Sequence, residues 1–389
     1  MSAEPARPAA GNDAAPRVQI VDPSAYTPPY DRALCAALAS AGAEVELVTS
    51  RFLYGTVPEP NGYRVTELFY RRWQRRPASR ARLAAKLAQH PLDMHRLSQG
   101  SGLAIPNPDL RHFQWLSVPQ FDRWALRRLS GPLVLTAHDV LPREPRPGQI
   151  RGQRRLYDAV DAVIAHTEHG RRRLTDELGV DAAKVRVIEP GAFDYLTELR
   201  EERPLEPALG EWLGDRPVAL FFGLMRPYKG LDVLLDAWGG VRGDARLVIA
   251  GMPRMGIAPL EARADDRVRL IPRFITDAEI PALFRRAQLV VLPYWEIEQS
   301  GVLYTAFAFG KATVLSRVGG FIEVGDRDGA ARLVAPGDPD DLAGALSELL
   351  FDPAGRERLE EAARRAASER YSWREAARRH LELYAELAA

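Results

Sequence analysis

The sequence predicts an α/β protein made of two doubly wound domains that face a central cleft. Three observations lead to this prediction. At 389 residues the chain is too long for one ordinary hydrophobic core. Short apolar runs alternate along it with segments of helical period, which is typical of right-handed βαβ crossovers and a parallel sheet. A polar, proline-bearing stretch divides these runs into two series, so each series is expected to build its own sheet.

The apolar runs are the expected strands. The first series comprises 17–22, 44–49, 132–137, 162–167 and 185–190. The second series comprises 218–223, 246–251, 268–274, 289–294, 312–317 and 331–336. Most of these runs are apolar almost throughout, as expected of strands covered by helices on both faces of a sheet. The carboxyl ends of both sheets would then face the cleft, where ligands bind in such folds.

The expected divisions of the chain follow from this pattern. They are a disordered tail (1–16), an N-terminal domain (17–195), a linker (196–217), a C-terminal domain (218–370) and a C-terminal helix that packs back on the N-terminal domain (371–389). The tail is rich in Ala and Pro and lacks the apolar core of a signal peptide.

Composition excludes several classes of protein. The net charge of +1 argues against a general polyanion binder. Cys35 is the only cysteine, which excludes an internal disulfide framework and indicates a reducing compartment. The sequence has no Cys/His grouping with zinc spacing and no apolar run near the roughly 18 to 20 residues that span a bilayer. We therefore expect a cytoplasmic protein.

The first strand ends at Asp22 and runs into a proline-rich turn. Pro28, Pro29 and Tyr30 stand just before a helix expected to begin at Asp31. These residues would either line the cleft or form a rigid turn that contacts no ligand.

A basic segment occupies 71–87. It holds seven cations and no acid between Arg71 and Lys86. Such a run is consistent with a solvated face, and equally with contact to an anionic membrane surface or a lipid diphosphate. Nucleic acid is not an expected partner, because no nucleic-acid-binding motif accompanies the charge.

Two further segments of the N-terminal half carry histidine. His138 and Asp139 follow the strand 132–137 directly, so the histidine is either a structural residue or a group that handles a ligand or a proton. His166 and His169 lie beside Arg171–Arg173, and we expect a solvated helix start there rather than a metal site.

In the second half, two cations follow a buried strand. Gly223 ends the strand 218–223 and lets the backbone approach a ligand closely, and Arg226 and Lys229 come next. Two cations at the carboxyl end of a strand suit a diphosphate, although two exposed cations on a loop would look the same.

The segment 293–323 strengthens the ligand interpretation. An acidic loop with Glu296 and Glu298 leads into Ser300-Gly301, where small residues open an apolar helix. The N–H groups at such a helix start attract an anion, and the carboxylates suit sugar hydroxyls.

These paired segments resemble the C-terminal domain of glycosyltransferase family 4. The Arg-then-Lys pattern of the family matches Gly223, Arg226, Lys229 and Gly230, and its acidic loop, helix start and later Gly-Gly-x-x-Glu match Glu298, Ser300-Gly301 and 319–323. The resemblance covers about 17–387 and is specific mainly in 218–345. It implies the GT-B fold of two Rossmann-like domains, and transfer of a sugar from a nucleoside-diphosphate sugar with retention of configuration and without a metal.

The resemblance also implies roles for residues. Catalytic roles would fall to His138, Arg226 and Lys229. The donor would contact Gly223, Phe274, Glu298, Ser300, Gly301, Val302 and Thr305. Pro29, Tyr30 and Asp139 would lie on the acceptor side. No metal and no other cofactor is expected, and the acceptor would be a glycan, a lipid-linked sugar or a small molecule.

One departure from the family concerns Thr305. Family members carry a second glutamate where this chain has Thr305, seven positions after Glu298. A carboxylate that would hold the donor ribose is therefore missing, and a hydroxyl replaces only part of its contacts. Two alternatives to a transferase are a sugar-nucleotide epimerase of the same fold and a non-catalytic nucleotide-sugar binding protein.

Overall fold

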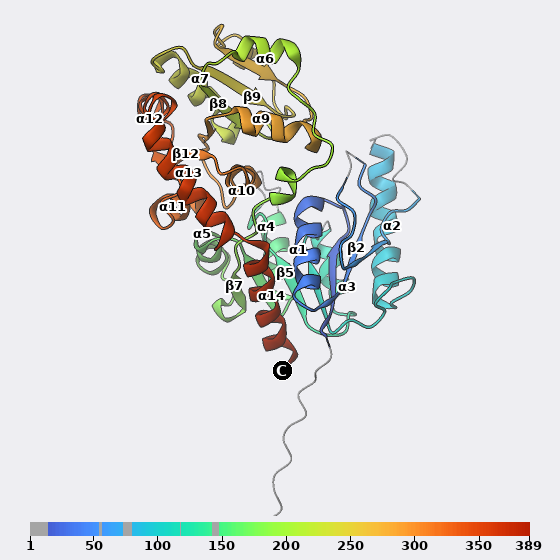
Figure 1. Cartoon of the computed structure of the whole chain (residues 1–389). Helices are drawn as coiled ribbons and strands as arrows, with labels where there is room; N and C mark the ends of the chain where they lie inside the picture. Colours follow the sequence, from blue (N-terminus) through green and yellow to red (C-terminus); the bar gives the residue numbers. More distant parts are fainter. Residues whose placement is uncertain (1–14, 54–56, 73–79, 117, 142–147) are drawn as a thin grey trace, which may run out of the picture.

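The computed structural model describes residues 15–53, 57–72, 80–116, 118–141 and 148–389. Residues 1–14 of the expected tail lie outside the described part. Figure 1 shows two lobes, each with a sheet flanked by helices. The N-terminal lobe holds a 7-stranded sheet and the C-terminal lobe a 6-stranded sheet, and every strand pair in both sheets is parallel. The predicted fold class is confirmed.

The N-terminal sheet has the strand order β3-β2-β1-β4-β5-β6-β7. Its strands are β1 (Arg17–Asp22), β2 (Glu44–Thr49), β3 (Arg64–Glu67), β4 (Leu110–Phe113), β5 (Leu133–Thr136), β6 (Ala162–Ala165) and β7 (Val185–Val187). The helices around it are α1 (Pro28–Ser40), α2 (Arg80–Ser98), α3 (Pro119–Leu126), α4 (Gln149–Asp158) and α5 (Glu168–Arg172), the last continued by a π-helical turn (Arg173–Glu177).

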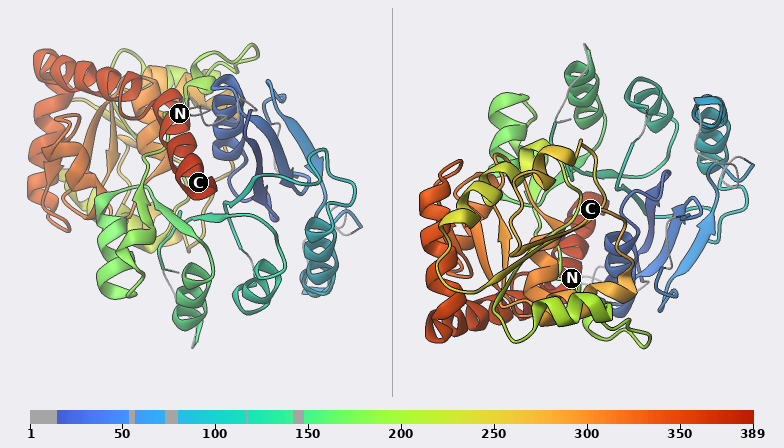
Figure 2. Two further views of the ribbon diagram at one scale, coloured as in Figure 1. Left: turned by 90° about the horizontal axis from the view of Figure 1, so that it is seen from below. Right: turned by 90° about the horizontal axis from the view of Figure 1, so that it is seen from above.

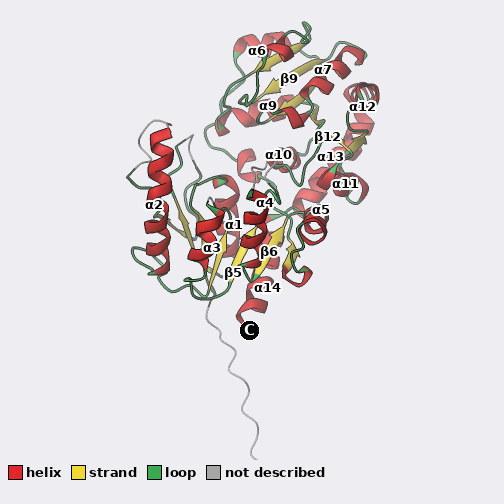
Figure 3. Cartoon of the chain, turned by 180° about the vertical axis from the view of Figure 1, so that it is seen from behind, coloured by secondary structure: helices red, strands yellow, loops and turns green. Residues whose placement is uncertain are grey.

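The C-terminal sheet has the order β10-β9-β8-β11-β12-β13. Its strands are β8 (Val218–Phe222), β9 (Arg246–Ala250), β10 (Val268–Ile271), β11 (Leu289–Leu292), β12 (Ala312–Ser316) and β13 (Arg332–Val334). Its helices are α7 (Leu231–Gly240), α8 (Ala258–Glu261), α9 (Ile280–Arg286), α10 (Gly301–Ala308), α11 (Gly319–Asp326), α12 (Pro339–Phe351) and α13 (Pro353–Ser368). Figure 3 shows the strands of both lobes enclosed between helices.

The central strands carry the core of each lobe. In β1, Val18 pairs with Val45 on one side and Leu110 on the other. In β8, Leu220 lies between Val248 and Val290 in the same way. These side chains are at most 2% exposed, and each aliphatic side chain buried this way contributes about 1.5–3 kcal/mol.

Two strands, β3 and β4, were not expected from the sequence, and β4 lies at the centre of the sheet beside β1. Its sequence, LRHF, places an arginine and a histidine where an apolar strand would be recognised. Arg111 is nevertheless 1% exposed, because it donates to the Gln19 side chain at 3.0 Å and to the Ser130 carbonyl at 2.8 Å. Buried polar groups need such partners, and these come from distant parts of the chain.

The end of the chain joins the two lobes. Along the chain, a 3₁₀ turn (Asp194–Thr197) and the short helix α6 (Pro207–Leu213) follow β7 and precede β8. Helix α14 (Trp373–Ala388) follows α13 out of the C-terminal lobe and packs against α1 of the N-terminal lobe (Figures 1 and 2). The Trp373 indole donates to the Ala192 carbonyl at 2.8 Å, and the Tyr384 hydroxyl lies 2.7 Å from Nδ1 of His112. The final helix is thus part of the N-terminal lobe.

Candidate active site

Each sheet has one point at which its strand order reverses. In the N-terminal sheet this switch point lies between β1 and β4, and in the C-terminal sheet between β8 and β11. Doubly wound folds bind ligands beyond the carboxyl ends of the strands at such a point. The residues predicted to bind a diphosphate follow β8 and β11, so the structure brings them to one switch point.

The loop after β8 places Lys229 against Gly223. Gly223 has φ +109°, and a Cβ added to it would lie 3.3 Å from Nζ of Lys229 and 3.1 Å from Cγ2 of Val302. Lys229 is 7% exposed and its Nζ lies 4.8 Å from the centre of the Tyr294 ring, within cation–π range. A side chain at position 223 would crowd both atoms, so the glycine lets the Lys229 ammonium group and the first turn of α10 come close to the backbone at the end of β8.

Arg226 stands at the start of the 3₁₀ turn Pro227–Lys229 and is half-buried. Within the described residues its guanidinium has no hydrogen-bond or ion-pair partner. An arginine carries five N–H donors, so this side chain is available to an anion.

The start of α10 supplies backbone donors. Ser300 is the N-cap residue, with extended backbone and a side chain that does not cap the helix. The amides of Leu303 and Tyr304 bond to the Ser300 carbonyl, whereas in the described structure the amides of Gly301 and Val302 have no backbone acceptor. The partial positive charge of a helix N-terminus adds to these two N–H groups.

Thr305 faces its own helix. Its hydroxyl donates to the Gly301 carbonyl at 3.0 Å, and the residue is 5% exposed. With its proton committed to the backbone, Thr305 retains only acceptor capacity and carries no negative charge.

Glu298 is held from the opposite lobe. Its carboxylate forms an ion pair with Arg173, the first residue of the π-helical turn after α5. Its carbonyl accepts from the Thr167 hydroxyl at 3.3 Å, and a Cβ on Gly320 would overlap that same carbonyl at 2.2 Å. The carboxylate predicted for the donor sugar thus lies at the interface between the lobes, whereas Glu296 on the same loop is exposed.

The residues after β10 lie to one side. Strand β10 lies at the edge of the sheet with β9 between it and β8, so Phe274, which follows β10, is two strands away from β8. Phe274 is 41% exposed, Ile275 packs into the core, and Arg273 is paired with Glu279 at 2.7 Å.

His138 is enclosed at the carboxyl edge of the N-terminal sheet. Its Nε2 lies 2.9 Å from the Gln114 side chain, its Nδ1 lies 3.3 Å from Nε2 of His166, and its ring stacks on Trp115 at 4.9 Å. The residue is 5% exposed. Burial and the neighbouring His166 hold the pKa of His138 well below its usual range, so the ring is neutral near pH 7.

The hydrogen bonds determine where the proton of this neutral ring lies. Nδ1 of His166 is 2.9 Å from the Ile188 carbonyl, which only accepts, so His166 carries its proton on Nδ1. Its Nε2 must then accept from Nδ1–H of His138. The remaining nitrogen of His138, Nε2, is therefore an acceptor. The Gln114 side-chain amide donates to it when its NH₂ group, rather than its oxygen, is assigned to face His138.

The expectation of a solvated helix start at His166 and His169 is wrong for His166. Burial lowers the pKa of His166 to about 4, and the residue is 3% exposed. The sequence could not reveal this, because the partner carbonyl belongs to Ile188, at the end of the neighbouring strand β7.

The three residues predicted for the acceptor side are placed differently from one another. Asp139 is exposed. Tyr30 is 5% exposed and its ring packs edge-on against His138 at 4.8 Å, so it lies within the lobe. Pro29 is half-buried and lines a hollow of about 530 Å³ between α1 and the start of α14.

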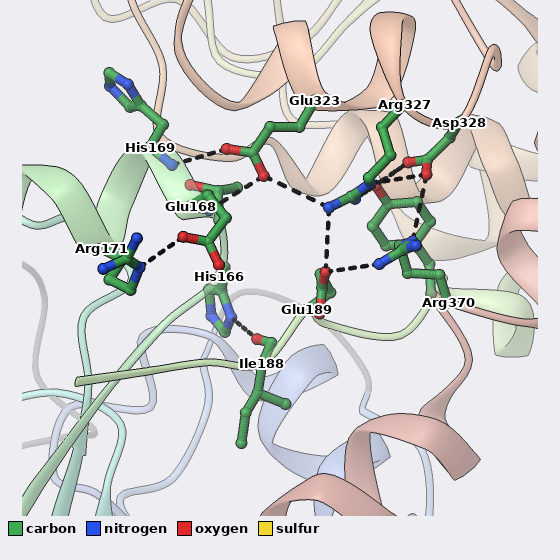
Figure 4. A network of polar contacts seen from close by, with 12 residues as sticks. His166, Glu168, His169, Arg171, Ile188, Glu189, Glu323, Arg327, Asp328 and Arg370 are labelled. Carbon is green, nitrogen blue, oxygen red and sulfur yellow. Dashed lines mark hydrogen bonds and ion pairs between the residues drawn. The ribbon is translucent and has the colours of Figure 1, made fainter. Parts of the chain in front are cut away.

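A polar network at the lobe interface was not predicted as part of the site. Glu323 of α11 accepts from the backbone amides of Glu168 and His169, at 3.1 and 2.7 Å, and so caps α5 of the other lobe (Figure 4). Glu189, after β7, lies 3.6 Å from Arg327 and 3.5 Å from Arg370. Only the Gly-Gly-x-x-Glu motif, which contains Glu323, gave a sequence signal for this network.

Neither a metal centre nor a membrane span is found among the described residues. No group of three or more His, Cys, Asp and Glu side chains in them could hold a metal ion. None of their helices has both the length and the apolar character needed to cross a bilayer.

Comparisons with known proteins agree on one family. The profile described as "Glycosyl transferases group 1" matches residues 216–352, and that described as "Glycosyltransferase Family 4" matches 32–192. A D-inositol 3-phosphate glycosyltransferase of Xylanimonas cellulosilytica is 33% identical over 296 residues, which is 70% of this chain and 70% of that protein. The protein of the same name from Mycobacterium tuberculosis (strain F11) is 32% identical over 276 residues, 65% of this chain and 55% of that one.

Solved structures share the arrangement of the two lobes. A sucrose-phosphate synthase from Thermosynechococcus elongatus superposes with a TM-score of 0.72 at 19% identity, covering 96% of this chain and 99% of that one. Anabaena HepE, solved in complex with UDP and glucose, superposes with a TM-score of 0.70 at 20% identity, covering 95% and 99%. At such identities the likeness shows the fold alone.

Proposed function

This chain belongs to the glycosyltransferases of group 1 and family 4 and has the GT-B fold, and we propose that it moves a sugar from a nucleoside-diphosphate sugar to an acceptor with retention of anomeric configuration. Retention of configuration is inferred from the family resemblance. It is not inferred from a nucleophile, because no described side chain of the site is assigned that role. The solved relative with bound UDP supports a uridine nucleotide as the first donor to test.

The observation that carries the proposal is the close approach of Lys229 and the first turn of α10 to the backbone at Gly223. Arg226 lies three residues further along the same loop, and its guanidinium is available to an anion. We assign the surface beside these groups to the donor diphosphate, which would accept hydrogen bonds from both cations and from the amides of Gly301 and Val302. Each charge-assisted hydrogen bond of this kind is worth about 1.5–3 kcal/mol.

Stabilisation of the leaving group would be the main catalytic effect. Negative charge grows on the diphosphate as its bond to the sugar breaks, and cations already in place meet that charge without reorganisation. Arg226 and Lys229 would thereby fill the role that a metal has in other transferases, and we expect no metal requirement.

The remaining contacts would position the donor. Glu298 and Ser300 would contact the sugar, Thr305 would accept one hydrogen bond from the ribose, and backbone groups near Phe274 would border the base. His138 and the exposed carboxylate of Asp139 would face the sugar and acceptor from the N-terminal lobe. Contact between the lobes would exclude water that otherwise hydrolyses the donor.

The proposal is tested first by nucleotide binding. UDP, GDP and ADP are added separately to the full chain, and at least one should raise the melting temperature by mass action. The matching nucleotide sugar is then followed with EDTA present throughout, and sugar released from an α-linked donor should first appear as the α-anomer by NMR. If no nucleoside diphosphate changes the melting temperature, the proposed donor site is wrong. If the sugar is first released as the β-anomer, the proposal of retention is wrong.

We also propose that the N-terminal lobe contacts an anionic membrane. Of the basic segment 71–87, the structure describes 71–72 and 80–87. On α2, Leu83 and Leu87 are 59% and 48% exposed and stand one helical turn apart, and Lys86 directly precedes Leu87 in the sequence. Exposed apolar side chains close to cations are typical of a helix that lies on an anionic lipid surface.

Co-sedimentation with vesicles tests this contact. The full chain should pellet with phosphatidylglycerol vesicles and not with phosphatidylcholine vesicles, and replacement of Leu83 and Leu87 by Glu should abolish pelleting. Equal recovery in the two pellets, or no effect of the double replacement, would leave the segment a solvated face.

A further inference from the structure

The switch point of the N-terminal sheet carries an exposed aromatic residue that the proposed donor site does not use. Tyr26 follows β1 and Trp115 follows β4, the two strands between which the strand order reverses. Their ring centres are 4.5 Å apart at an interplanar angle of 51°. The Tyr26 ring thus lies where a doubly wound fold offers its own binding crevice, in the lobe opposite the diphosphate site.

Tyr26 is 64% exposed, yet its ring is held by a chain of contacts. The Tyr26 ring contacts Trp115, whose indole N–H donates to the Thr27 hydroxyl at 3.0 Å and whose ring also stacks on His138 at an angle of 12°. An exposed side chain normally moves among rotamers, whereas this one has its supporting ring fixed by the core of the lobe.

The backbone that carries Tyr26 is fixed as well. The Asp22 carboxylate accepts from the amides of Ser24, Tyr26 and Thr27 at 3.1, 2.5 and 3.3 Å. Ala25, between them, has φ +49°, a left-handed conformation that costs an alanine free energy. Strain of this kind persists where the surrounding structure determines it, and it concentrates at binding sites.

A second carboxyl group stabilises Asp22 itself. The side chains of Asp22 and Asp31 are hydrogen-bonded to each other, and both residues are at most 1% exposed. Burial and the Asp22 carboxylate raise the pKa of Asp31 well above its usual range, so Asp31 stays protonated and donates to Asp22. The pair therefore carries one negative charge, on Asp22, and the three loop amides donate hydrogen bonds to that carboxylate.

We propose that Tyr26, supported by Trp115, is the stacking platform for the acceptor, and that the acceptor presents a pyranose ring there. A sugar ring has one face of C–H groups, which packs on an aromatic ring, and a rim of hydroxyls that stays hydrogen-bonded to water or to polar neighbours. A rigid, exposed ring with an uncharged stack beneath it suits such a face and gives an alkyl chain or a phosphate no comparable contact. The inference rests on the proposed transfer reaction, whose donor site lies in the other lobe.

Saturation-transfer NMR on the full chain, with UDP present, tests the platform. The probes are methyl α-D-mannopyranoside, methyl β-D-glucopyranoside, glucose 6-phosphate and inositol. At least one pyranoside should receive saturation mainly at the C–H protons of one ring face. Tyr26→Ala should reduce its affinity at least fivefold, and Tyr26→Phe, which keeps the ring, should retain it. A response of glucose 6-phosphate alone would identify a phosphorylated sugar as the acceptor. A response of the uncharged glycosides would identify the terminal sugar of a glycan as the acceptor.

Controls separate this inference from the proposed function. Trp124→Ala removes another exposed aromatic side chain, on α3, and should leave pyranoside binding unchanged. UDP binding, measured by thermal shift, should be equal in wild type and both Tyr26 variants, and the melting temperature without ligand should stay close to that of wild type because the side chain is exposed. Failure of UDP to bind wild type would count against the donor site only. Pyranoside binding that is absent from wild type, or unaffected by Tyr26→Ala, would overturn the platform.

Discussion

The two switch points of this molecule use the same backbone device for opposite chemistry. The one in the C-terminal sheet is lined by a glycine, two cations and backbone amides, which all suit an anion. The one in the N-terminal sheet is lined by Tyr26, Trp115 and the neutral ring of His138. The buried carboxyl pair nearby, Asp22 and Asp31, has its negative charge hydrogen-bonded to the amides of the loop. This asymmetry fits the proposed transfer, in which negative charge develops on the leaving diphosphate and the proposed acceptor presents an uncharged sugar face.

The charged switch point predicts the largest effect. Arg226→Ala or Lys229→Ala should lose about 2–4 kcal/mol of transition-state stabilisation, by analogy with removal of one preorganised donor, so kcat/KM should fall roughly 30- to 1000-fold. Arg242→Ala is the matched control, because Arg242 is an exposed arginine just after the C-terminal end of α7. Initial rates over a range of donor concentrations measure the change. Near-wild-type kcat/KM in both site variants would show that the comparison of the two switch points is wrong.

The neutral switch point predicts an acid-sensitive N-terminal lobe. Burial lowers the pKa of both His166 and His380 to about 4, whereas an unfolded histidine titrates near 6.5. Because the folded pKa values lie below the unfolded one, this stability is complete above pH 6.5 and is lost as pH falls toward 4. The two residues together should cost about 3 kcal/mol of unfolding free energy by pH 5.5.

Urea denaturation between pH 7.5 and 5 measures this loss. His380→Phe removes one of the titrating groups, together with a buried Nε2 that has no partner in the described structure, so its stability should fall less steeply with pH. His95→Asn, at an exposed histidine, is the control, and its unfolding free energy should depend on pH as that of wild type does. A stability that is flat over this range would contradict neutral, buried histidines.

The contact between the lobes predicts the smallest of these effects. Without Arg173, the nearly buried Glu298 carboxylate loses its ion-pair partner and its orientation, so Arg173→Ala should raise the donor KM about tenfold, which is about 1.4 kcal/mol, with a smaller change in kcat. Arg172→Ala, at an exposed neighbour, should change neither constant. Donor KM and kcat measured together distinguish a positioning role from general destabilisation. An unchanged KM would mean that Glu298 does not need its partner from the other lobe.

The proposed donor half of the site could be located in the sequence because its signals are short and local. Gly223, Arg226 and Lys229 lie within one loop, and Glu298 to Thr305 within one loop and helix start, each after a strand visible as an apolar run. The acceptor half could not be predicted in this way. Trp115 follows β4, whose buried Arg111 and His112 make it resemble a polar loop, because their partners Gln19 and Tyr384 are far along the chain.

The sequence by itself determined two parallel sheets, the family and the position of the loop that we propose binds the diphosphate, because strand period, glycine placement and charge are properties of neighbouring residues. Only the tertiary structure decided which polar side chains are buried and neutral, which carboxylate is held by the opposite lobe, and which aromatic ring stays exposed. Burial and pairing depend on residues brought together from distant parts of the chain, and the free energy of a charge or a ring depends on that surrounding more than on its own identity.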